Sequence, residues 1–314
     1  MSFLKILTLL IFQTTAISCA KILGVFLFPS VSHQVVYTNV MAELSKHGHE
    51  VTVITTDPIS NPNLKNYTEI DIHNEAYDFK RKSTVFGLIE RLDIQLTEKT
   101  YTKVLEMLTG MCELHLSLPQ VQKLIQSGQK FDLIFIIFLG TPCLNAYGYH
   151  YNAPIIGISS FELFSMGYDI IRAPNNPAID TFVYLPYIGH RNLFQKLRCL
   201  IFIIYNKILY HWYILPKQDA IARKYFGDDL PYIGDLDANI SLVMAYTNPA
   251  LLYPRANVPA LIEIGGGDIH FSKPKKLPKV REREKKKFFC HCLLTRLFQR
   301  FLYKERKKKN FCAT

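Results

Sequence analysis

The sequence predicts an α/β fold in which a parallel β-sheet carries helices on both faces. Three observations predict it. Short apolar, β-rich runs alternate with segments of helical periodicity over about residues 21–160. Several of these runs are continuously apolar, as strands buried on both faces should be. Alternation of this kind implies parallel strands joined by right-handed helical crossovers.

The first predicted unit is a strand, a helix and a second strand. Residues 22–28 are apolar until Pro29 ends the run, and Ser32 is placed to cap the following helix. Apolar residues then recur at helical spacing up to Gly48, and residues 51–55 form the second strand. The helix therefore starts where the carboxyl end of the first strand opens into a crevice, which is where open parallel sheets bind ligands.

The other predicted elements are, in chain order, a strand at 68–72, helical stretches within 85–126 broken at Pro119, a strand at 133–139, a helix at 142–151, a strand at 154–160, and strands at 241–245 and 261–264. Residues 161–191 are rich in Pro and Asn. We expect a long irregular binding loop there.

The segment 193–215 is strongly apolar and aromatic. Asn206 and Lys207 interrupt it, so it falls short of a transmembrane helix. We interpret it as a buried helix that lines the domain. The alternatives are a wall of an apolar ligand pocket and a surface that lies on a membrane.

His33 is the candidate catalytic residue. It lies in the first turn of the first predicted helix, at the predicted crevice. The helix dipole disfavours an imidazolium at that end, so we expect a neutral ring. A neutral imidazole in a cleft can act as a general base toward a hydroxyl. The alternative is a capping or solvated histidine.

Several separated stretches give the chain a resemblance to a known family. They are Phe28-Pro-Ser-Val-Ser-His33, His47-Gly-His-Glu-Val-Thr-Val-Ile-Thr55, Phe131-Asp-Leu133, Asn152-Ala-Pro-Ile-Ile-Gly-Ile-Ser-Ser160, and Tyr253-Pro-Arg255 running on to Ile264-Gly-Gly-Gly267. In this order they resemble the amino-terminal half of the UDP-glycosyltransferases, of the UDP-glucuronosyltransferase-like insect type. The resemblance implies a Rossmann-like acceptor-binding domain at 21–272, the first half of a two-domain GT-B glycosyltransferase.

The resemblance also implies a reaction. A hexose would pass from a UDP-sugar to a hydroxyl of a small lipophilic acceptor, with His33 as the base and with no cofactor and no metal. The family's carboxylate partner of the base is matched here by Ile137, and Glu162 is the only nearby carboxylate that could stand in. Contacts to the donor would come from a second domain, so no residue here is assigned to them.

The amino terminus predicts entry into the secretory pathway. Residues 1–20 combine Lys5, a short apolar core and small residues before the end of the segment, as in a cleaved signal peptide. Asn66 and Asn239 open glycosylation sequons, which matter only in that pathway. We therefore expect a location in the lumen of the endoplasmic reticulum or secretion. The cysteines show no disulfide framework, and Cys290-His-Cys292 lacks a second ligand pair for zinc.

Residues 273–314 form a basic tail outside the family pattern. Sixteen Lys and Arg stand against three Glu there, a net charge of +13, whereas the whole chain carries +11 and residues 1–272 carry −2. The excess of positive charge is therefore no sign that the globular part binds nucleic acid. We interpret the tail as a truncation or gene-model artefact. The alternative is a basic amphipathic helix on an anionic membrane.

Two functions remain open at this point. As an enzyme truncated before its donor domain, the chain alone is expected to transfer no sugar, because catalysis needs donor and acceptor held together. The rival is a non-catalytic, truncated paralogue that binds lipophilic ligands or pairs with a full-length enzyme. A nucleic-acid or membrane-binding protein that acts through its tail is the third hypothesis.

Overall fold

The computed structural model describes residues 19–90, 98–180, 182, 184–185, 187, 190–248 and 255–266. Most of the predicted signal peptide and the whole predicted tail at 273–314 lie outside the described residues. All described residues belong to one compact unit, which ends at Asp268.

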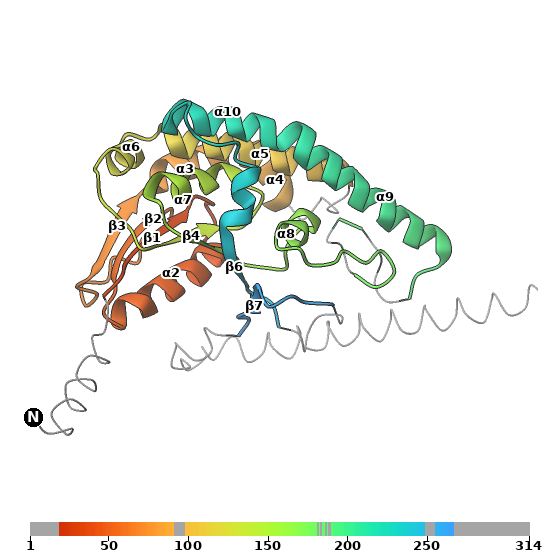
Figure 1. Cartoon of the computed structure of the whole chain (residues 1–314), viewed down its shortest axis with the longest axis horizontal. Helices are drawn as coiled ribbons and strands as arrows, with labels where there is room; N and C mark the ends of the chain where they lie inside the picture. Colours follow the sequence, from red (N-terminus) through yellow and green to blue (C-terminus); the bar gives the residue numbers. More distant parts are fainter. Residues whose placement is uncertain are drawn as a thin grey trace, which may run out of the picture. The chain divides into compact units, whose positions relative to one another are not determined.

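A seven-stranded sheet forms the centre of this unit, in the spatial order β3-β2-β1-β4-β5-β6-β7 (Figure 1). Every pairing between its strands is parallel. The strands are β1 Lys21–Phe26, β2 Glu50–Thr55, β3 Tyr67–Asp71, β4 Leu133–Ile137, β5 Ile155–Ser159, β6 Ile240–Ala245 and β7 Leu261–Glu263. The predicted α/β fold with a Rossmann-like parallel sheet is confirmed.

Helices cover both faces of the sheet. They are α2 Val31–Lys46, α3 His73–Lys82, α4 Thr84–Glu90, α5 Glu98–Ser117, α6 Pro119–Ile125, α7 Asn145–Tyr151, α8 Ser165–Ile170, α9 Leu193–Leu209 and α10 Leu215–Phe226, with short helical turns η1 Pro142–Leu144, η2 Tyr210–Ile214 and η3 Asp235–Asn239. Figure 1 shows α2 on one face and α5, α7 and α10 on the other. Right-handed crossovers produce this division, because the chain moves one way from β1 to β3 and the other way from β4 onward.

The sheet has its topological switch point between β1 and β4. The chain leaves β1 toward β2 and leaves β4 toward β5, on opposite sides, although β1 and β4 are direct neighbours. At such a point the two connections diverge and leave a crevice at the carboxyl ends of the strands. The connection after β1 leads to His33. The connection after β4 turns at Gly140, whose φ of +78° favours glycine.

One local prediction was wrong. Helix α2 begins at Val31, so Ser32 lies inside its first turn, and the N-cap residue is Ser30, without a side-chain capping bond. The region at 161–191 is irregular in its described residues, as expected, except for the short helix α8. Gly167 allows α8 to pack closely, since a Cβ at that position would lie 3.0 Å from the ring of Phe138.

The apolar segment at 193–215 forms α9, the π-helical turn η2 and the start of α10. Asn192 starts α9 through a capping box with Gln195. Pro216 lacks an N–H and crowds the carbonyl four residues earlier, which accounts for the wide turn between the two helices. The interpretation as a buried helix holds for only one side, because Phe194 and Trp212 are more than four-fifths exposed.

A disulfide joins Cys112 on α5 to Cys143 in η1. It ties the long helix on one face to the segment that follows β4. The expectation that the cysteines form no disulfide framework therefore missed one bond in the core, where both residues are fully buried.

Candidate active site

A single buried amide fixes the segment that carries His33. Gln34 is 1% exposed, and its Nε2 donates to the carbonyl oxygens of Phe26 at 3.0 Å and Phe28 at 2.9 Å. Its Oε1 accepts a hydrogen bond from Thr55 Oγ1 at 2.9 Å. Gln34 thus ties the ends of β1 and β2 together directly beside His33, the residue before it.

His33 lines a cavity of about 340 Å³ at the switch point. This volume falls within the usual range for small-molecule sites. Most of the wall is aromatic or aliphatic, and the polar groups come from a few residues. The cavity is lined by Phe28, His33, Val104, Met107, Leu108, Leu139, Phe161, Glu162, Phe164 and Tyr184. The arrangement suits a small, mainly apolar molecule with one polar group directed at the imidazole.

The His33 ring is held between aromatic rings and a hydroxyl. Its centroid lies 4.8 Å from that of Phe28 and 5.5 Å from that of Phe161, the latter edge-on. Its Nδ1 lies 2.5 Å from Ser160 Oγ. Burial, and to a smaller degree the charge of Lys80, lowers the pKa of His33 to about 4. The ring is therefore neutral at pH 7.

The Ser160 hydroxyl takes part in a second hydrogen bond. Tyr37, fully buried on α2, donates from its Oη to Ser160 Oγ at 3.1 Å. A hydroxyl has one hydrogen and two lone pairs, so Ser160 can still either donate to His33 Nδ1 or accept from it. Only acceptance from Nδ1–H leaves Nε2 with a free lone pair for a substrate proton. The direction of the hydrogen bond between Ser160 and His33 thus decides whether Nε2 carries the ring proton or the free lone pair.

Glu162 shares the cavity with His33, but its carboxylate has a different partner. Arg255, only 9% exposed at its side chain, lies 3.5 Å from Glu162 Oε1 and 3.3 Å from Asp180 Oδ2. Its guanidinium also stacks 3.3 Å from the centre of the Tyr168 ring. Arg255 therefore neutralises Glu162 and binds the 161–180 segment to the chain that follows β6.

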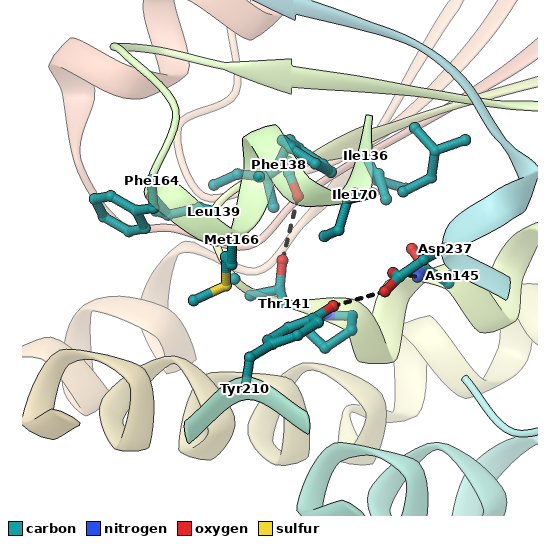
Figure 2. A pocket seen from close by; sticks show the side chains of 15 residues that line it. Ile136, Phe138, Leu139, Thr141, Asn145, Phe164, Met166, Ile170, Tyr210 and Asp237 are labelled. Carbon is teal, nitrogen blue, oxygen red and sulfur yellow. Dashed lines mark hydrogen bonds between the residues drawn. The ribbon is translucent and has the colours of Figure 1, made fainter. Parts of the chain in front are cut away.

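Ile137, the match to the family's acid position, is fully buried at the end of β4 and is absent from the wall of the His33 cavity. It lines a different, much smaller cavity of about 20 Å³, room for about one water (Figure 2). Asp237 lies there and accepts from Tyr210 Oη at 2.9 Å and Asn145 Nδ2 at 2.8 Å. Burial raises the pKa of Asp237 to about 6, against the effect of these two bonds.

The two sequon asparagines lie at the surface. Asn66 is exposed immediately before β3, and Asn239 is exposed at the end of η3. Both positions are therefore open to a glycan. Within the described residues, no three His, Cys, Asp or Glu side chains are grouped closely enough to hold a metal ion.

Sequence reasoning missed Gln34, Tyr37, Ser160 and Arg255. One signal was available for Gln34. Gln34 and Thr38 are polar residues at helical spacing with Met41 on the face of α2 that packs against the sheet, and a polar residue on such a face needs a buried partner. Ser160 and Arg255 lie inside stretches that resemble the family, but their partners are distant in sequence.

Known proteins resemble the chain in sequence. It is 28% identical to UDP-glucosyltransferase 2 of Dactylopius coccus over 260 residues, which are 82% of this chain and 49% of that protein. It is 30% identical to the ecdysteroid UDP-glucosyltransferase of Lacanobia oleracea granulosis virus over 285 residues, 87% of this chain and 57% of that protein. The chain therefore spans about half the length of the curated relatives it matches. No protein-family model matches it.

Solved structures add a weaker likeness. The calicheamicin glycosyltransferase CalG4 matches 79% of this chain and 53% of its own, with 14% identity and a TM-score of 0.45. A likeness at this level adds nothing to the sequence evidence. That evidence identifies the chain as a relative of the UDP-glycosyltransferases that resembles their amino-terminal half.

Proposed function

We propose that this domain is the acceptor-binding half of a UDP-glycosyltransferase and that His33 is the base that removes the acceptor's hydroxyl proton. The observation that carries the proposal is the position of a neutral imidazole in the wall of a mainly apolar cavity at the switch point. The acceptor would be a small lipophilic alcohol. The relatives named ecdysteroid UDP-glucosyltransferases make a steroid alcohol a reasonable probe.

In this mechanism the acceptor hydroxyl donates to His33 Nε2 while Nδ1–H donates to Ser160 Oγ. As the acceptor oxygen attacks the anomeric carbon of the sugar, the bond from that carbon to UDP breaks and UDP leaves. The hydroxyl proton passes to Nε2 and the imidazole becomes positively charged. A carboxylate would stabilise that charge strongly. Ser160 offers only a neutral acceptor, backed by the Tyr37 hydroxyl. The donor UDP-sugar would be held by groups outside the described residues.

The test joins the described domain to the carboxyl-terminal half of a relative, such as UDP-glucosyltransferase 2 of Dactylopius coccus. We expect transfer from a UDP-sugar to a steroid alcohol, and a fall of at least about 100-fold in kcat for His33→Gln, the usual scale of a lost general base. Binding of the alcohol should change little. Equal turnover with and without His33 in folded chimeras would refute the assignment.

A non-catalytic role is the second candidate, and one observation favours it. Within the described residues no carboxylate is hydrogen-bonded to His33, and Ile137 occupies the matched acid position. The same cavity would then bind a lipophilic ligand for carriage or for regulation of a full-length enzyme. An acceptor that binds the chimera tightly but is never glycosylated, with or without His33, would favour this role.

We also propose that the chain resides in the secretory pathway. The Cys112–Cys143 disulfide supports an oxidising compartment, and the exposure of Asn66 and Asn239 supports glycosylation there. Digestion with an endoglycosidase should lower the apparent mass of the protein expressed in insect cells. Loss of that shift in the Asn66→Gln, Asn239→Gln double variant would locate the glycans.

A further inference from the structure

Helix α9 presents an apolar surface to solvent. We define its outer face as the large apolar side chains of α9 and η2 that are at least 39% exposed. They are Leu193, Phe194, Leu197, Leu200, Ile201, Ile204, Tyr205, Ile208 and Trp212. They recur at spacings of three and four residues, so they form one continuous stripe. An apolar stripe of this length on a surface marks an interaction site.

The opposite side of the same helix is already packed. Cys199, Phe202 and Ile203 are no more than 5% exposed and belong to the main core. Phe202 lies 5.8 Å from Tyr101 and 6.4 Å from Tyr184 between ring centroids. Leu193–Phe226 is long and apolar enough to cross a bilayer. Its inner side, however, is packed against the core of the protein. The helix can therefore lie on a membrane but not span it.

Within the helical segment that carries the outer face, the charged residues have one sign. Between Asn192 and Gln218 there is no Asp or Glu, whereas Lys196, Arg198, Lys207 and Lys217 lie within that range. Lys196 is exposed beside the stripe, and Lys207 is half exposed, with one ion pair to Asp169. An apolar face whose own helical segment carries cations and no acid complements anionic lipid headgroups.

The most exposed aromatic side chains mark the two ends of the stripe. Phe194 is 81% exposed and Trp212 is 82% exposed. At a rise of 1.5 Å per residue they lie about 27 Å apart along the helix. Aromatic rings are favoured at the boundary between headgroups and acyl chains. Because the inner side of α9 is packed in the core and prevents it from spanning the bilayer, both ends can reach that boundary only if the helix lies parallel to the membrane.

We infer that the outer face of α9 docks on a membrane surface that carries anionic lipid, with the helix parallel to the bilayer. The convex, one-sided stripe fits a fluid bilayer, which adapts to a helix. The inference stands independently of sugar transfer. It also brings lipid close to the His33 cavity, since Phe202 on the inner side of α9 contacts Tyr184, which lines that cavity.

The chain contains its own reporter, because Trp212 is its single tryptophan. The full chain is titrated with phosphatidylcholine–phosphatidylserine vesicles, and with pure phosphatidylcholine vesicles for comparison. We expect a blue shift of the tryptophan emission and strong quenching by lipids with brominated acyl chains. Binding should be tighter with phosphatidylserine present. The basic tail at 273–314 contains no tryptophan, so attachment through the tail alone cannot produce these signals.

Matched variants locate the contact. Ile204→Glu changes a residue of the outer face that is 49% exposed, and Ile59→Glu changes an isoleucine beyond β2 that is 41% exposed. We expect the first to weaken the fluorescence-detected binding roughly tenfold, the scale of one aliphatic side chain kept in water, and the second to leave it unchanged. Both substitutions are at the surface, so both variants should fold.

Three outcomes would overturn the inference. Vesicles that carry the protein down without changing Trp212 emission would assign membrane binding to the tail. A blue shift that grows with protein concentration in the absence of vesicles would assign the face to a second copy of the chain. Equal loss of binding in the Ile204→Glu and Ile59→Glu variants would separate binding from α9.

Discussion

Introducing a carboxylate at Ser160 tests the geometry around His33 directly. Ser160 Oγ lies 2.5 Å from His33 Nδ1, so Ser160→Asp would place the two charge centres about 4 Å apart. With an effective dielectric constant of about 20, their attraction is about 4 kcal/mol, equivalent to about three pKa units. A carboxylate favours the protonated ring, so we expect the pKa of His33 to rise from about 4 to about 7.

The assay is a pH titration of the His33 ring signals by NMR in protein labelled at histidine. The shifts of Nδ1 and Nε2 also report which nitrogen carries the proton in the neutral form. Ser160→Asn is the matched control, because asparagine has the size of aspartate without its charge. It should leave the pKa of His33 low.

Two results would refute the reasoning. If His33 titrates near 6.5 in the unchanged chain, its burial is not what the structure indicates. If the pKa stays near 4 in a folded Ser160→Asp variant, the side chain at position 160 does not face the imidazole. A dispersed NMR spectrum of each variant establishes that it is folded.

Three further predictions concern stability, each measured by urea unfolding. Replacing Cys112 and Cys143 together by serine should cost about 3–4 kcal/mol, because the bond closes a loop over a sequence separation of 31, and equal stability would contradict the bond. Burial lowers the pKa of His115 to about 3. As pH falls from about 6.5 toward 3, this residue should therefore reduce the free energy of unfolding by about 1.4 kcal/mol per pH unit. His115→Gln should remove that pH dependence. The raised pKa of Asp237 means that its contribution to folding stability is fully present below about pH 4 and is lost as pH rises through about 6. Asp237→Asn should therefore stabilise the protein at pH 7 by about 1–3 kcal/mol. A loss of stability at pH 7 would show that the two hydrogen bonds of Asp237 outweigh the cost of its burial.

Most of the sheet could be predicted because its central strands are apolar runs of the expected length between turn residues. The position of His33 followed from the same pattern, since a residue just after the first strand of such a sheet must lie at its carboxyl edge. Its contact with Ser160 could not be predicted. The two residues are 127 positions apart, and their meeting depends on how α2 is placed relative to the residue that follows β5.

Which side of α9 faces solvent could not be predicted from the sequence, for a different reason. Periodicity separates a buried from an exposed side only when the two sides differ in polarity, and α9 is apolar on both. The disulfide was missed because spacing along the chain does not reveal that Cys112 on α5 faces the turn that carries Cys143. In both cases tertiary packing supplied the missing information.

The buried amide of Gln34 has a consequence for any molecule that enters the His33 cavity. Its three hydrogen bonds hold the backbone at the ends of β1 and β2 before a ligand arrives. Ligand binding therefore need not order this part of the cavity wall, and the conformational entropy of ordering it is already lost during folding. Affinity at this cavity should then follow the apolar area that the ligand itself buries.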